Sequence, residues 1–485
     1  MTVSQALRAH PVLTLFSSIL VVKLALLGFD PTVRLFFGDS ASYIHSALTG
    51  WVPPDRSYLY GQLFRATALT AHSMFVLVLV QSLFGAIAAV LLFAILRANF
   101  ETPMQLAVAL AVLLAVEPGQ LFYERMVMAE SAGTLSLVAM FAAGFAYLRR
   151  PHWLWPILWA AAGILAVAFR LSDLPVVLGF AVLPVLAGAV GAAPRVPARK
   201  FVVHLAVALV ATAALHDGYR HWYAWISGTP RADYIADTGY FRLGLVAPLV
   251  TREEVVRAGL PADLLDHVGP DLRDPRMREA QVWEPNGLIA LVREAGNGFG
   301  NRAARKLSSY ALRGDPSGLL WLSWSTVKDY FDPAVVAARI ADDVGSRPAG
   351  ADLTEKLRRC CNYDASVLAA ETNPIARYFK VSTLWLTACY FGLLPLAIAM
   401  LAVQWQRARS AALLLAATGA GMVCAQTLFA HIVSFRYLHP FPFVVLLCVG
   451  ALASAFRGGV SSVQANVSGG RMPVATDRQA TASRG

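Results

Sequence analysis

The sequence predicts an all-α, polytopic membrane protein. Of its 485 residues, 57% are hydrophobic and only 15% are charged, whereas a soluble globular chain carries roughly 25% charged residues. Apolar runs at 11–29, 74–96 and 381–403 each approach the ~20 residues that a helix needs to cross the hydrocarbon core of a bilayer. This composition excludes an ordinary soluble enzyme, a disordered chain and a small disulfide-bonded scaffold.

About ten segments are long and apolar enough to be transmembrane helices. We expect the first to be an uncleaved span, because no small-residue cleavage site follows it. The third is interrupted by Glu117-Pro118-Gly119, where Glu117 is expected to end a helix. In chain order the predicted spans are 11–29, 74–96, 104–122, 131–148, 153–169, 174–193, 201–216, 381–403, 411–430 and 438–456.

These spans predict the domain organisation. An N-terminal transmembrane module covers 1–216 and includes a first outer segment at 30–73, in which we expect amphipathic helices. A large loop domain, mainly helical, covers 217–380, and the C-terminal transmembrane helices cover 381–456. The tail at 457–485 is rich in Ser, Gly, Ala and Gln and is predicted to be disordered.

Basic residues in the short loops predict the orientation. They all fall on one side of the predicted bundle, together with Arg8 and the tail, and the positive-inside rule makes that side cytoplasmic. The net charge of +11 is therefore attributed to lipid headgroups rather than to nucleic acid. Compact loops and Ala/Arg/Val-rich usage indicate a bacterial plasma membrane. The basic residues of these loops are Arg149, Arg150, Arg195, Arg199, Lys200, Arg407 and Arg409.

Charged residues recur where predicted spans meet the outer interface. A charge at bilayer depth costs ~2.5–3.5 kcal/mol on insertion scales, so we expect these residues to converge on a polar cavity. Carboxylates can act as general bases, and guanidiniums bind phosphate bidentately. Such a cavity suits a reaction on a lipid-linked phosphate. The residues are Asp39 and Asp55 in the first outer segment, Glu124, Arg125 and Glu130, then Arg170 and Asp173, and finally Arg436, Tyr437 and His439.

Four features resemble the GT-C superfamily of integral-membrane glycosyltransferases, in particular the protein-mannosyltransferase and lipid A aminoarabinose-transferase type. They are Gly38-Asp39-Ser40 with Tyr43, the apolar and aromatic stretch at 51–71, Tyr123-Glu124-Arg125 with Glu130, and Arg436-Tyr437-Leu438-His439-Pro440. The resemblance covers roughly the first 215 residues and 380–456, and the loop domain matches no pattern. Many members carry two adjacent acidic residues in the first outer loop, whereas Asp39 stands alone here, so Asp55 is a second candidate.

The resemblance implies transfer of a sugar from a polyprenyl-phosphate carrier to a cell-envelope glycan, glycolipid or protein, with inversion, outside the cytoplasm. It makes Asp39 the base. It makes Arg125, Arg170 and Arg436 the residues that bind the donor phosphate. No cofactor is implied, a divalent cation is left open, and no metal site follows from the spacing of His and Cys residues. Residues that would contact sugar, acceptor or isoprenoid are Tyr43, Asp55, Glu124, Glu130, Tyr437 and His439.

Purely structural roles for the same residues stay open. Asp39 could cap a helix, Glu124 and Arg125 could be interfacial, and Arg170 with Asp173 could form an ion pair at i, i+3. Lys23 lies within the first span and is expected to extend toward the outer interface. For Cys360-Cys361 we expect two free or separately oxidised thiols rather than a strained disulfide.

Two other functions also stay open. One is a polymerase or ligase that uses diphosphate-linked oligosaccharides, since such enzymes often carry a large late outer loop. The other is a transporter or flippase for lipid-linked sugars, although neither inverted repeats nor broken helices at the midplane are evident.

Overall fold

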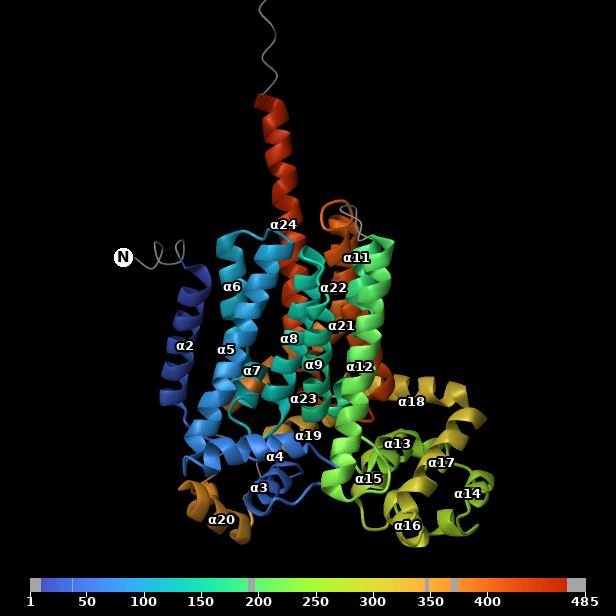
Figure 1. Ribbon diagram of the computed structural model, residues 1–485. Helices are drawn as coiled ribbons and strands as arrows, with labels where there is room; N and C mark the ends of the chain where they lie inside the picture. Colours follow the sequence, from blue (N-terminus) through green and yellow to red (C-terminus); the bar gives the residue numbers. More distant parts are fainter. Residues whose placement is uncertain (1–9, 37, 191–196, 345–348, 368–373, 469–485) are drawn as a thin grey trace, which may run out of the picture.

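The computed structural model describes residues 10–36, 38–190, 197–344, 349–367 and 374–468, and Figure 1 shows a bundle of long helices with a helical domain at one end. Within these residues eight helical segments are long and apolar enough to cross a membrane, and no strand occurs. The prediction of a multi-pass helical membrane protein is confirmed. The eight segments are Pro11–Phe29, Met74–Asn99, Glu130–Arg149, Leu171–Val190, Ala198–Ser227, Pro374–Gln404, Arg409–Phe429 and Phe435–Phe456.

Two predicted spans form shorter apolar helices. α6 (Met104–Ala115) ends early, and α7 (Pro118–Tyr123) begins after a break at Glu117. Proline lacks an N–H and disfavours a helical conformation at the residue before it. The Glu117 carboxylate instead accepts a hydrogen bond of 2.7 Å from the Gln120 N–H and caps α7. α9 (Leu154–Phe169) has 16 residues, which span ~24 Å at 1.5 Å per residue.

Small residues let the helices of the bundle approach closely. α8 (Glu130–Arg149) packs along α9 and α5 (Met74–Asn99). A Cβ atom on Gly144 of α8 would lie 2.5 Å from Phe180 at the end of α10 (Leu174–Phe180). Such small residues favour helix packing in lipid, where burial of apolar surface drives association only weakly.

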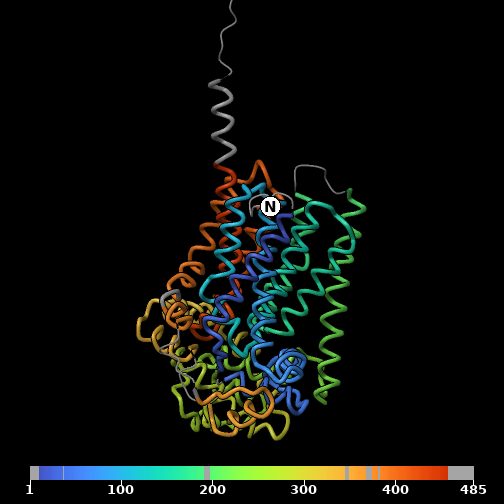
Figure 2. Tube along the Cα trace, turned by 90° about the vertical axis from the view of Figure 1, so that its left-hand side faces the viewer, coloured from blue at the N-terminus to red at the C-terminus, as the bar shows by residue number. Residues whose placement is uncertain are grey.

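The remaining helices complete the bundle, as the two perpendicular views in Figures 1 and 2 show. α21 packs against both α22 and α24. α24 is helical as far as Ser468, and residues 469–485 of the predicted disordered tail lie outside the described residues. The bounds are α2 (Pro11–Phe29), α11 (Leu183–Val190), α12 (Ala198–Ser227), α21 (Pro374–Gln404), α22 (Arg409–Phe429), α23 (Phe435–Leu438) and α24 (Phe441–Ser468).

The two ends of the bundle differ in character. The α5–α6, α8–α9 and α21–α22 connections lie at one end, with the start of α2 and the end of α24 (Figure 1). The other end carries α3, α4 and the loop-domain helices. The basic residues Arg149, Arg150, Arg407 and Arg409 lie in or beside the connections at the first end.

The first outer segment is helical, as predicted. α3 (Ser40–Thr49) and α4 (Tyr58–Phe64) are followed by a π-helical turn at Arg65–Leu69. The Ser57 hydroxyl accepts a hydrogen bond of 3.1 Å from the Tyr60 N–H and caps α4. Both helices lie across the end of the bundle (Figure 1).

The loop domain is mainly helical and has its own core, in which Leu243, Val292 and Leu307 are fully buried. Its flanking helices extend further than predicted, α12 to Ser227 and α21 back to Pro374. The helices are α13 (Thr238–Val246), α14 (Arg252–Ala258), α15 (Arg278–Trp283), α16 (Leu288–Ala295), α17 (Gly300–Gly314), α18 (Pro316–Asp329), α19 (Pro333–Val344) and α20 (Ala351–Cys361).

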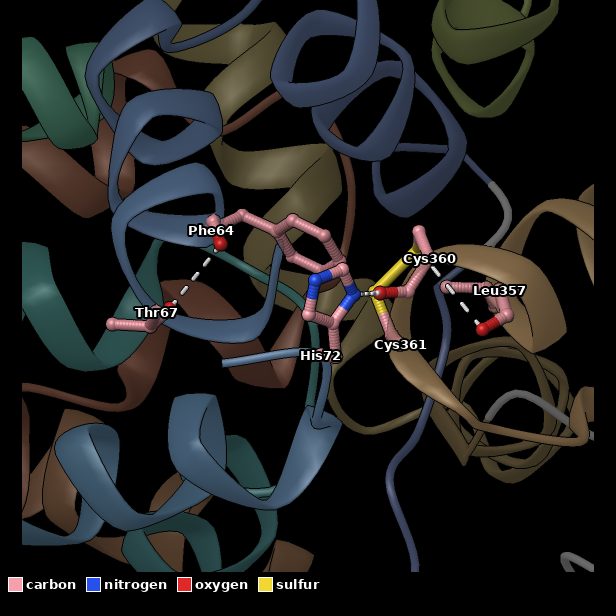
Figure 3. Close-up of a disulfide and its surroundings, with 6 residues drawn as sticks. All are labelled: Phe64, Thr67, His72, Leu357, Cys360 and Cys361. Carbon is pink, nitrogen blue, oxygen red and sulfur yellow. Dashed lines mark hydrogen bonds between the residues drawn. A yellow bond between two sulfur atoms is a disulfide. The ribbon is translucent and has the colours of Figure 1, made fainter. Parts of the chain in front are cut away.

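α20 is attached to the first outer segment. Cys360 and Cys361 form a disulfide, so the prediction of two thiols is wrong. Figure 3 shows the Cys360 carbonyl oxygen beside the His72 ring, 3.1 Å from Nδ1. The Tyr363 hydroxyl donates a 2.8 Å hydrogen bond to the Val33 carbonyl. These two contacts hold the end of the loop domain beside the residues that lead to Asp39.

Candidate active site

A cavity of about 1080 Å³, here called the main cavity, opens where the bundle meets the loop domain. It exceeds the ~300–1,000 Å³ typical of small-molecule sites. Three predicted site residues, Glu124, Arg125 and His439, do not line it. The seven that do are Asp39, Tyr43, Asp55, Glu130, Arg170, Arg436 and Tyr437.

Asp39 lies between two guanidinium groups. Its Oδ2 accepts a hydrogen bond of 2.8 Å from Nη1 of Arg436, and its Oδ1 lies 3.1 Å from Nη1 of Arg56. Asp39 immediately precedes α3, but its side chain makes no capping hydrogen bond. The capping interpretation of Asp39 is therefore wrong, and its carboxylate faces the main cavity.

Hydrogen bonds to a neighbouring loop hold Asp39 in position. The Ser40 hydroxyl donates to the Val127 carbonyl and accepts from the Phe36 N–H, both at 2.8 Å. The Arg34 N–H donates to the Arg125 carbonyl at 2.8 Å, and the Val127 N–H donates to the Arg34 carbonyl at 2.9 Å. Buried backbone groups need such partners, so these pairings fix the path of the chain into Asp39.

Arg436, which pairs with Asp39, also contacts a third arginine, Arg170. The Arg436 guanidinium carbon lies 5.0 Å from the ring centre of Phe36 and 5.1 Å from that of Tyr437. Arg170 donates from Nη2 to the Arg436 carbonyl at 3.0 Å, and its Nε lies 4.0 Å from Oε1 of Glu130. Nη1 of Arg170 is buried without a hydrogen-bond partner. The two arginines therefore provide donors for an anion in the main cavity.

The ion pair expected between Arg170 and Asp173 is not formed. Arg170 turns toward α8, where a Cβ on Gly133 would lie 2.7 Å from its Cδ. Oδ2 of Asp173 is buried without a hydrogen-bond partner, and Asp173 does not line the main cavity. A side chain at position 133 would therefore collide with Arg170 in its present position.

Arg56 is the site residue that sequence reasoning missed. Its Nη1 lies 3.5 Å from Oδ2 of Asp55, and it also donates to the Gly38 carbonyl. Its guanidinium carbon lies 5.2 Å from the ring centre of Trp283 in α15. A charged dipeptide, Asp55-Arg56, in an otherwise apolar stretch was the signal that could have indicated it.

The environment shifts the pKa of several groups around the main cavity. Burial raises the pKa of Asp55, although Arg56 opposes the shift. Burial also raises the pKa of the Tyr43 hydroxyl well above its usual range. Burial lowers the pKa of His431 to about 3, so its ring is neutral at pH 7. Burial raises the pKa of Asp343, at the end of α19, to about 7.

Glu124 belongs to a buried ion pair behind the site. Its Oε1 lies 2.6 Å from Nζ of Lys23 and accepts a 2.7 Å hydrogen bond from Nε2 of Gln120. Lys23 also donates to the Ala115 carbonyl at 2.8 Å. The expectation that Lys23 extends to the interface is wrong: its side chain is only 1% exposed. The Glu124 side chain, at the end of α7, is likewise buried within the protein and 0% exposed.

Arg125 and His439 bind protein groups as well. Arg125 donates from Nη1 to the Leu121 carbonyl at 2.8 Å and from Nε to the Asp30 carbonyl at 3.1 Å. Nδ1 of His439 lies 3.2 Å from the Thr134 hydroxyl, and Nε2 lies 3.0 Å from Oε1 of Gln120. Both side chains are buried, so they support the residues around the main cavity without facing it.

One part of the main cavity is apolar. Leucine and phenylalanine side chains from both the bundle and the loop domain line it alongside the charged residues. A cavity with a charged part and an apolar part matches an amphiphile, a molecule with a polar head and a hydrocarbon chain. The apolar lining includes Leu174, Leu178, Leu245, Leu312, Leu319 and Phe429.

Among the residues that the structure describes, no group of three or more His, Cys, Asp or Glu side chains is arranged to hold a metal ion. No protein-family model matches this chain, and no curated protein matches it. The likeness to the GT-C superfamily thus depends on the short motifs and the predicted topology.

Proposed function

We propose that this protein is a membrane glycosyltransferase that moves a sugar from a polyprenyl-phosphate carrier to a cell-envelope acceptor. One observation carries the proposal: the Asp39 carboxylate and the Arg436 guanidinium, 2.8 Å apart, face a cavity that also has an apolar wall. A carboxylate can take a proton from a hydroxyl, and a guanidinium can bind a phosphate. The apolar wall would accommodate the isoprenoid.

The donor phosphate would bind between Arg436 and Arg170. Arg170 is linked to the Arg436 backbone by a 3.0 Å hydrogen bond, and its buried Nη1 has no partner of its own. Charge-assisted hydrogen bonds to phosphate are about twice as strong as neutral ones. The carrier chain would then follow Leu174, Leu178 and Phe429 toward the membrane.

The reaction would be a single displacement. Asp39 accepts the proton of the acceptor hydroxyl while that oxygen forms a bond to the anomeric carbon. The bond from the anomeric carbon to the phosphate oxygen breaks, and its electron pair leaves with the polyprenyl phosphate. Arg436 and Arg170 stabilise the charge on the leaving phosphate. Attack opposite the leaving group inverts the anomeric configuration.

The other residues that line the main cavity would orient the substrates. Glu130 accepts hydrogen bonds from sugar hydroxyls, and the Tyr43 and Tyr437 rings contact the sugar or the isoprenoid. Arg56 lies 3.1 Å from Asp39, so it would hold the carboxylate in the orientation that receives the proton.

The site would face the outside of a bacterial plasma membrane. The interhelical loops that carry basic residues lie at the opposite end of the bundle, as the positive-inside rule requires of the cytoplasmic side. The Cys360–Cys361 disulfide in the loop domain supports the same orientation, because disulfides persist in oxidising compartments.

A transfer assay tests the proposal. Protein in lipid nanodiscs would receive synthetic short-chain polyprenyl-phosphate sugars, and release of polyprenyl phosphate would be measured. We expect release with at least one donor. Consumption of diphosphate-linked oligosaccharides alone would indicate a polymerase or ligase instead. Movement of intact donors between leaflets without bond cleavage would indicate a flippase.

A further inference from the structure

A second, smaller cavity lies in the loop domain directly beside the main cavity. It holds about 210 Å³, the space of about seven water molecules at ~30 Å³ each, which is comparable to a single sugar ring. Asp55, Phe241 and Trp283 line both cavities. This side cavity is therefore adjacent to the place where the proposed transfer occurs.

The side cavity is attached to the first outer segment. The Asp237 N–H donates a 2.8 Å hydrogen bond to the Pro54 carbonyl, next to Asp55. The Tyr223 hydroxyl donates to the Pro53 carbonyl at 2.7 Å. A ligand in the side cavity would thus be held at a defined distance from the chain that carries Asp39.

The lining combines aromatic faces with paired charges. Trp283 is 49% exposed, and its ring lies 5.9 Å from that of Phe241 in an edge-to-face arrangement. Nη2 of Arg293 lies 3.3 Å from Oδ2 of Asp237, and its guanidinium carbon lies 4.8 Å from the ring centre of Tyr240.

Sugars match this combination of groups. A sugar ring presents C–H bonds on its faces, which pack against aromatic rings, and hydroxyls at its edge, which both donate and accept hydrogen bonds. Carboxylates accept from hydroxyls, whereas guanidiniums donate to them. An anionic lipid headgroup would instead meet three carboxylates, Asp55, Asp237 and Glu284, which disfavour it.

Arg56 connects the side cavity to the proposed base. It lies 3.1 Å from Asp39 and 3.5 Å from Asp55, and it stacks over Trp283 at 5.2 Å. A sugar seated against Trp283 would therefore direct a hydroxyl past Asp55 and Arg56 toward Asp39.

We propose that the side cavity binds the acceptor and that the acceptor is a carbohydrate, whose terminal sugar packs on Trp283 between Asp55 and Asp237. This rests on the proposed function only in calling the bound sugar the acceptor. Binding of a carbohydrate at this position requires no donor.

Saturation-transfer NMR tests the proposal without a donor. Protein in nanodiscs, free of sugar-based detergent, would be mixed with methyl glycosides of common envelope hexoses and N-acetylhexosamines, or with glycerol 1-phosphate. We expect at least one glycoside to show saturation transfer. Trp283→Ala should weaken that binding at least ~5-fold, as truncation of a central aromatic anchor does. Asp237→Asn should also weaken it.

Trp324→Ala is the matched control, because Trp324 is 60% exposed on α18 and lines neither cavity. Two results would overturn the proposal. One is that no glycoside binds in a manner that depends on Trp283, and the other is that only glycerol 1-phosphate does so. Failure of the proposed function is a separate result, since it would appear as no polyprenyl phosphate release while glycoside binding persists.

Discussion

At the scale of single residues, Arg436 has two partners in the proposed reaction, Asp39 and the donor phosphate. Arg436→Lys would keep the charge but lose the planar, forked donor geometry. A hydrogen bond to a charged group contributes about 1.5–3 kcal/mol, so kcat/KM for donor cleavage should fall roughly 10- to 100-fold. Steady-state kinetics with one donor measures this.

Arg252→Lys is the matched control, because Arg252 forms an exposed ion pair with Asp266 in the loop domain, and such pairs contribute about 0–1 kcal/mol. Its kcat/KM should stay close to that of the wild type. Equal losses in the two variants would contradict a special role for Arg436.

Asp343 supplies a pH-dependent prediction. Burial raises its folded-state pKa to about 7, against ~3.9 in an unfolded chain. Between these values the folded state keeps a proton that the unfolded state releases, so stability falls as the pH rises. Asp343→Asn removes this penalty, and its melting temperature should exceed that of the wild type by a margin that widens from about pH 4 to pH 7.

Thermal unfolding of purified protein at several pH values measures the margin, with Asp352→Asn, whose side chain is 82% exposed on α20, as the control. A margin that stays constant with pH would refute the assignment to Asp343.

Motifs predicted Asp39 and Arg436, which line the main cavity, together with Glu124 and Arg125, which do not line it. Glu124 follows the end of α7 whereas Glu130 begins α8, so Glu124 and Arg125 face the protein interior although Glu130 lines the main cavity. Arg56 escaped prediction because its contacts depend on the turn after Pro54, which no periodicity describes.

At the scale of elements, the Lys23–Glu124 pair joins α2 to the end of α7. Both side chains are essentially unexposed, at 1% and 0%. Lys23→Met would leave Glu124 buried without its cation, which costs about 3–5 kcal/mol. We expect a clearly lower melting temperature and recovery in the double variant Lys23→Met/Glu124→Gln. A double variant no more stable than the single one would argue against the pair.

Span positions followed from hydropathy because a bilayer requires runs of apolar residues. The ends of the helices could not be predicted from hydropathy, since a helix can continue into water without an apolar signal. α12 has 30 residues, or ~45 Å, and thus extends beyond the hydrocarbon layer into the loop domain. Conversely, Pro118 stops α6 within an apolar run.

At the scale of the whole molecule, the orientation is testable. A single cysteine would replace His152 in the α8–α9 connection or Ser317 at the start of α18, in a background whose native cysteines are replaced. In intact cells a membrane-impermeant thiol reagent should label the cysteine at position 317 and not the one at position 152. The reverse pattern would place the main cavity in the cytoplasm.

The structure of the loop domain could be predicted from the sequence in less detail than that of the transmembrane bundle. It was recognised as polar and helical, but its docking on the first outer segment depends on contacts such as Asp237 to Pro54, which are distant in sequence. The size of the main cavity and the existence of the side cavity follow from that docking, so neither could be predicted.

The most direct measurement compares wild type with Asp39→Asn in the release of polyprenyl phosphate from a donor that the wild type accepts. Removal of a general base typically costs 10²–10⁴-fold in rate, and we expect a loss of about that size. Asp173→Asn, whose carboxyl group lies outside the main cavity, is the control and should retain most of the rate. Wild-type turnover in a folded Asp39→Asn variant would contradict the assignment of Asp39 as the base.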